Sequence, residues 1–81
     1  RLNDKFSKGL QIDLNDRIAF IKHLFDKSPN DYQRSISQIS TLQDWDQAKV
    51  FILEIVKLDY DNWKGKELYE ERFLKIIENN F

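Results

Sequence analysis

The most apolar stretch of the chain, residues 48–58, organises the interpretation of the rest. Its β-branched and aromatic residues also suit a buried strand, so hydrophobicity alone does not assign it. The flanks favour a helix, because Asp44 can act as an N-cap and Gln47 stands three residues later, as in a capping box. No Gly or Pro interrupts residues 44–58. The sequence therefore predicts a long central helix.

Apolar residues occupy two sides of this central helix. One side is a broad stripe that is expected to face the core, made of Trp45, Ala48, Phe51, Ile52, Ile55 and Val56. Val50 and Leu53 lie off the stripe, on a second side. Such a helix is either central in its domain or covered by a partner, and the sequence leaves both alternatives open. Within the chain, the cover would come from Phe6, Leu10 and Ile12.

Three further segments show the spacing of amphipathic helices. The first has Asp13 or Asn15 as its N-cap and ends near Phe25. The second begins at Ser28-Pro29, a strong helix start, and extends to Leu42. The last runs from about Lys66 to Asn79, after a polar loop over residues 59–65.

A short helix is also expected within Arg1–Gly9, where Leu2 and Phe6 are at helical spacing. Two Gly and one Pro leave few turn signals for a β fold. The predicted fold is therefore all-α: a compact bundle of four main helices plus a short N-terminal helix, in a single domain over residues 1–81. The chain begins at Arg1 rather than Met, which suits a trimmed chain, a processed product or one domain of a longer protein.

Charge and composition argue against several functions for this chain. The net charge is −1, and Lys and Arg are spread along the sequence, so no basic patch for nucleic acid or anionic membrane is expected. No apolar run approaches the ~20 residues that span a bilayer, so no membrane insertion is expected. With no Cys and one His, neither thiol chemistry nor a zinc site is expected. We predict no catalytic residues, no metal and no cofactor, and hence not an enzyme.

Two local features carry alternative interpretations. Residues 59–70 imitate an EF-hand loop, but Lys64 stands where the loop requires Gly, which argues against calcium. Arg17 lies inside the apolar arc of its helix. One interpretation is a buried Arg that binds an anionic ligand. The other is that its aliphatic part packs on the core while the guanidinium group reaches water or pairs with an Asp. The position of Arg17 at a helix start, near water, favours the second interpretation. His23, on the outer side of that helix, is expected to be an ordinary surface residue.

The chain resembles a short helical domain of unknown function that recurs in uncharacterised bacterial proteins, at the C-terminal end of the chain. The resemblance spans most of residues 14–81. It is carried by an Asn-Asp-Arg start, Phe-Ile, Leu-Phe and later positions, here Asn15-Asp16-Arg17, Phe20-Ile21, Leu24-Phe25, Ala48, Trp63, Phe73-Leu74 and Phe81. Ile18, His23 and Asn79-Asn80 depart from the pattern. The resemblance implies a helical fold and a place as the C-terminal piece of a longer chain, and it implies no activity.

Together these observations predict a non-enzymatic protein–protein interaction or scaffold domain, with a cytoplasmic location assumed. Its partner would be another protein, another region of the parent chain, or a second copy in a homodimer. The candidate contact residues are Val50, Leu53 and Trp63, unless these side chains belong to the core. The alternative function is that of a small regulatory nucleic-acid-binding domain.

Overall fold

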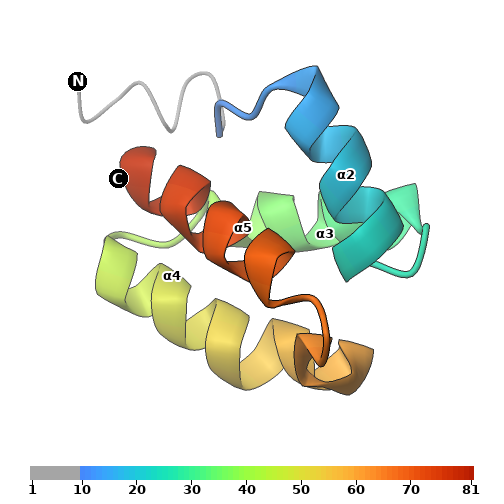
Figure 1. The fold of residues 1–81 in the computed structure, drawn as a ribbon. Helices are drawn as coiled ribbons and strands as arrows, with labels where there is room; N and C mark the ends of the chain where they lie inside the picture. The colour runs from blue at the N-terminus through green and yellow to red at the C-terminus, as the bar shows by residue number, and fades with distance from the viewer. Residues whose placement is uncertain (1–9) are drawn as a thin grey trace.

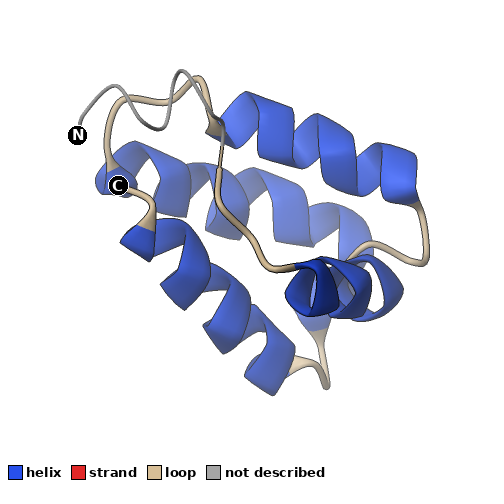
Figure 2. Ribbon diagram, turned by 90° about the horizontal axis from the view of Figure 1, so that it is seen from above, coloured by secondary structure: helices blue, strands red, loops and turns tan. Residues whose placement is uncertain are grey.

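A computed structural model describes residues 10–81, which form an all-α domain with no strand in that range (Figures 1 and 2). The elements in chain order are α2 (Leu14–Leu24), α3 (Pro29–Ile39), α4 (Trp45–Phe51), the π-helical turn η1 (Ile52–Val56), the 3₁₀ segment η2 (Lys57–Trp63) and α5 (Glu67–Asn79). The predicted fold class is confirmed. The short helix predicted within residues 1–9 lies outside the described residues.

Side-chain caps begin two of the helices as the sequence predicts. At the start of α3, the Ser28 hydroxyl accepts a hydrogen bond from the Asp31 backbone amide at 3.1 Å. At the start of α4, the Asp44 carboxylate accepts one from the Gln47 amide at 2.9 Å. The Gln47 side chain in turn accepts one from the Gln43 amide at 3.1 Å. These bonds satisfy amide groups that have no partner inside the helix.

Helix α5 lies between α2 and α4, and α3 packs against α2 (Figure 1). The end of the central helical segment returns to α2 through η2. The side chains that meet in the middle are almost all apolar and come from every element: Phe20, Leu24, Phe25, Tyr32, Ile36, Ile39, Ala48, Ile52, Val56, Trp63, Phe73 and Ile77. None of the helices in residues 10–81 is long and apolar enough to cross a membrane.

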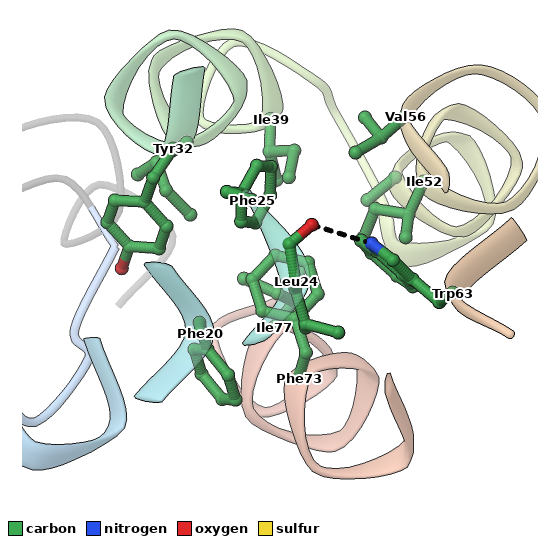
Figure 3. Close-up of a cluster of buried hydrophobic side chains, with 12 residues drawn as sticks. Phe20, Leu24, Phe25, Tyr32, Ile39, Ile52, Val56, Trp63, Phe73 and Ile77 are labelled. Atoms are coloured by element: carbon green, nitrogen blue, oxygen red, sulfur yellow. Dashed lines mark hydrogen bonds between the residues drawn. The ribbon is translucent and has the colours of Figure 1, made fainter. Parts of the chain in front are cut away.

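The ring of Phe25 is the meeting point of this core. It makes edge-to-face contacts with Tyr32 of α3, Tyr60 and Trp63 of η2, and Phe73 of α5, with ring centroids 5.3–6.1 Å apart. Figure 3 shows several of these rings converging from different elements. Aromatic pairs at such distances add to the stability that apolar burial provides. A single residue just after α2 therefore joins three other parts of the chain.

Trp63 ends the η2 segment and is completely buried. Its indole Nε1 donates a hydrogen bond to the carbonyl oxygen of Leu24 at 2.8 Å (Figure 3). Leu24 is the last residue of α2, where carbonyl groups lack partners within the helix. Asp61, Asn62 and Trp63 all have positive φ, which is uncommon for Asp and Asn and exceptional for a bulky residue. Burial and the indole hydrogen bond hold the chain in this turn.

The predicted central helix is continuous, but its geometry changes along its length. The α-helical part ends at Phe51, and a π turn and a 3₁₀ segment carry the chain on to Trp63. Part of the predicted polar loop is thus helical, and the real break lies at Tyr60–Asn62, where the backbone leaves helical geometry.

Replacing Trp63 by Phe should lower the free energy of unfolding by about 2–4 kcal/mol. The variant leaves the Leu24 carbonyl without its donor and opens space beside Phe25. Urea denaturation measures the loss. Leu68→Ala is the control, because Leu68 is 81% exposed and should change stability by about 0.5 kcal/mol or less. Equal losses in the two variants would contradict the anchoring role of Trp63.

Candidate protein-binding surface

The π turn decides which side chains of the central helix face the core. Ala48, Ile52 and Val56 are buried, whereas Ile55, which the sequence places in the core stripe, is 56% exposed. A π turn has i→i+5 hydrogen bonds, so each residue advances around the axis by less than the ~100° of an α-helix. Val56 therefore comes to lie below Ile52, and Ile55 is rotated outward. The prediction of a buried Ile55 is wrong for this reason.

An open apolar hollow lies on the outer side of this segment. It is lined by Leu42, Val50, Phe51 and Ile55, with Asp46 and Gln47 as polar neighbours, and we call these six residues the α4–η1 face. Val50 is 54% exposed, and Phe51 and Leu42 are half-buried. Leu58, one turn further along the chain, is 59% exposed. The sequence predicted Phe51 as a core residue, and in the structure its ring belongs partly to the core and partly to this face.

The three predicted contact residues are not brought together. Val50 lies on the α4–η1 face. Leu53 is half-buried and does not line the hollow. The sequence allowed Trp63 to be either a core residue or an exposed contact residue. Trp63 is fully buried, so it is a core residue. Ile55 and Leu42 were not predicted for this surface, and no sequence signal marks the π turn that exposes Ile55.

The described residues of the N-terminal segment do not cover Val50. Leu10 and Ile12 pack against the core and line a different hollow, beside α2 and α3. Phe6, the third residue expected to provide cover, lies outside the described residues. Among residues 10–81, the hollow is therefore uncovered.

Two polar contacts fix the end of the central segment after the π turn. The Lys57 ammonium group donates a hydrogen bond to the Glu70 carboxylate at 2.7 Å, and both side chains are largely buried. The Tyr60 hydroxyl donates to the Asp31 carboxylate at 2.9 Å, which Arg34 also contacts at 2.7 Å. These contacts tie the segment to α5 and to α3. They keep the α4–η1 face in one position relative to the core.

Two residues that the sequence analysis considered for metal binding or as ordinary surface, Glu70 and His23, make structural contacts. Glu70, the last residue of the EF-hand-like loop, forms an ion pair with Lys57. Within residues 10–81, no group of three or more His, Asp or Glu side chains is placed to hold a metal ion. His23 does not point into solvent as expected, because its ring stacks on Tyr69 of α5 with centroids 4.1 Å apart. The outer side of α2 is thus partly an interface with α5.

The hydrogen bond between Tyr60 and Asp31 shifts the pKa values of both groups. Burial, followed by the bond to the Asp31 carboxylate, raises the pKa of Tyr60 to about 12. The bonds from Tyr60 and then Arg34 lower the pKa of Asp31 below its ordinary value. The neutral phenol and the ionised carboxylate are therefore the forms that stabilise this contact.

Replacing Tyr60 by Phe should remove a pH-dependent part of the stability. Because the folded-state pKa of Tyr60 is raised above its ordinary value of 10.0, the phenol stabilises the fold below pH 10.0 and loses this effect as the pH rises toward about 12. The difference in unfolding free energy between the natural chain and Tyr60→Phe should shrink over this range. Urea denaturation at a series of pH values measures it. A difference that stays constant with pH would show that the phenol does not act through this bond.

Comparison with known proteins assigns the domain to a family but supplies no activity. Residues 10–81 match a family described as a domain of unknown function (DUF8457). No curated protein and no solved structure matches the chain. The match is consistent with the prediction of an uncharacterised domain. The chain therefore belongs to the DUF8457 family of domains of unknown function.

Proposed function

We propose that this chain is a non-enzymatic interaction domain whose α4–η1 face binds another protein or another region of its parent chain. The supporting observation is that Val50 and Ile55 are each more than half exposed and lie in one apolar hollow with Phe51. Scattered apolar side chains are normal on a protein surface, whereas a contiguous group often marks a binding site.

The energetics of this face suit a binding role. Completing the burial of Val50 and Ile55 would contribute about 1 kcal/mol for each side chain, since roughly half of each is already buried. Phe51 offers a ring that is held by the core on one side and open on the other. Aromatic anchors of this kind contribute much of the affinity at protein interfaces. The π turn adds support, because such turns occur frequently at functional sites.

The charges around the face favour a partner with basic residues. Asp46 lies in the hollow, and Glu54 is exposed on the same segment. A partner that surrounds apolar side chains with Lys or Arg would complement these carboxylates. A twofold pairing of two copies would bring the same acidic groups of both chains into one interface. The charge pattern therefore favours a different partner over a homodimer.

Site-specific photo-crosslinking in the cell that makes the full protein tests this proposal. A photoreactive amino acid at Val50 or Ile55 should give a discrete crosslinked product. The same group at Leu68 is the control, because Leu68 is apolar and 81% exposed but does not line the hollow. Ile55→Glu should abolish the product obtained from position 50 without unfolding the domain, since Ile55 already contacts water.

Two results would contradict the proposal. One is the absence of any product from both positions, and the other is the same products from Leu68 as from Val50. Sedimentation of residues 1–81 at increasing concentration examines the homodimer separately. A dimer that Ile55→Glu dissociates would identify a second copy as the partner on this face.

The alternative of a nucleic-acid-binding domain gains no support from an observation on residues 10–81. Adding duplex DNA at low salt to the isotope-labelled protein should leave its backbone amide signals unchanged. Shifts that grow with DNA concentration and vanish at high salt would instead favour that alternative.

A further inference from the structure

A second hollow, of about 340 Å³, lies where the chain that leads into α2 faces α3. Its volume is within the range of small-molecule sites. Polar side chains from both helices line it, together with the apolar side chains of Leu10, Ile12 and Ile36. None of the lining residues belongs to the α4–η1 face, so an inference about this hollow is independent of the proposed function.

Tyr32 supplies a hydroxyl group to this hollow. The residue is only 3% exposed, and its ring packs edge-to-face on Phe25. Its oxygen points away from the buried cluster (Figure 3), and the residue lines the hollow. No group in residues 10–81 hydrogen-bonds to this hydroxyl, and because no fully buried side-chain polar atom in that range lacks a partner, the Tyr32 oxygen is open to solvent in the hollow. Burial raises the pKa of Tyr32, so the group remains a hydrogen-bond donor at neutral pH.

Arg17 supplies a positive charge that is not neutralised within the described part of the chain. Its guanidinium group has no carboxylate of residues 10–81 within ion-pair distance. The adjacent Asp16 is instead held by Arg72 of α5, through two hydrogen bonds of 2.7 and 3.1 Å. Arg17 therefore forms no ion pair with an Asp of residues 10–81, which was one of the arrangements that the sequence allowed. Arg17 is exposed and lines the same hollow as Tyr32.

A third donor is available on α3. The Gln33 side-chain amide donates to the Ser37 hydroxyl oxygen at 3.3 Å, which leaves the Ser37 hydroxyl hydrogen able to point into the hollow. Arg17, Tyr32 and Ser37 thus present donors from two helices to one space. Arg17 is the one charged residue among the described residues that line it.

We propose that this hollow binds a monoanionic carboxylate that is attached to an apolar group, with Arg17 and Tyr32 as the main donors. A planar guanidinium group binds a carboxylate through two parallel hydrogen bonds. One cation balances one negative charge, and Asp16 is close enough to act on Tyr32 electrostatically, which disfavours a more highly charged anion. Leu10, Ile12 and Ile36 would contact the apolar part of the ligand.

The carboxylate can belong to a small organic acid or to the C-terminus of a peptide, and two probes distinguish these sources. One is hexanoate, and the other is an acetylated leucyl-leucine with a free carboxyl terminus. Each is titrated into isotope-labelled residues 1–81 and followed by backbone amide shifts. Saturable shifts centred on Tyr32, Gln33 and Ser37 are expected for at least one probe. The probe that saturates at the lower concentration identifies the source.

Matched compounds and variants test the assignment of the donors. Hexanamide and the peptide amide, which keep the shape but lack the charge, should bind at least about tenfold more weakly. Arg17→Gln should weaken carboxylate binding by a similar factor, and Tyr32→Phe should weaken it by a smaller factor while keeping the buried ring. Unchanged amide spectra far from the hollow would show that both variants fold. Failure of both acids to give saturable shifts, or equal affinity in Arg17→Gln, would overturn the proposal.

Discussion

The hydrogen bond from the buried indole of Trp63 to the Leu24 carbonyl joins the end of the central helical segment to the end of α2. The chain reaches this position through three consecutive residues with positive φ, an arrangement that costs on the order of 1–3 kcal/mol per strained residue. The aromatic cluster around Phe25 and the indole bond offset this cost. Because η2 ends there, the position of α5 and of the whole central segment depends on the same contact.

The π turn has a second consequence for the surface. By placing Ile52 and Val56 together in the core, it turns Ile55 outward beside Val50. A regular helix over the same residues would distribute Ile55 and Val56 on either side of the core direction. The geometry that fits the central segment to its neighbours thus also creates the α4–η1 face. Lys57–Glu70 and Tyr60–Asp31 then hold the following turn in place.

Within residues 10–81, some charged side chains form ion pairs, and others line the two hollows without an ion pair. Asp16, Asp31 and Glu70 are each paired with a cation, and two of these pairs link separate elements. Asp46 on the α4–η1 face and Arg17 in the hollow beside α3 are in no ion pair within the described residues. The two hollows therefore differ in chemistry: one is apolar with an acidic neighbour, and the other combines a cation with neutral donors.

The sequence by itself determined the fold class, the family resemblance and most helix starts, because amphipathic spacing and capping residues such as Ser28 and Asp44 act over a few neighbouring residues. Val50 could also be recognised as lying off the core stripe. The burial of Trp63, the exposure of Ile55 and the pairing of Asp16 with Arg72 were decided only by the tertiary structure. Each of these features depends on a contact between residues far apart in the chain, or on a change of helical pitch that such contacts stabilise. Local residue spacing encodes neither the contacts nor the change of pitch.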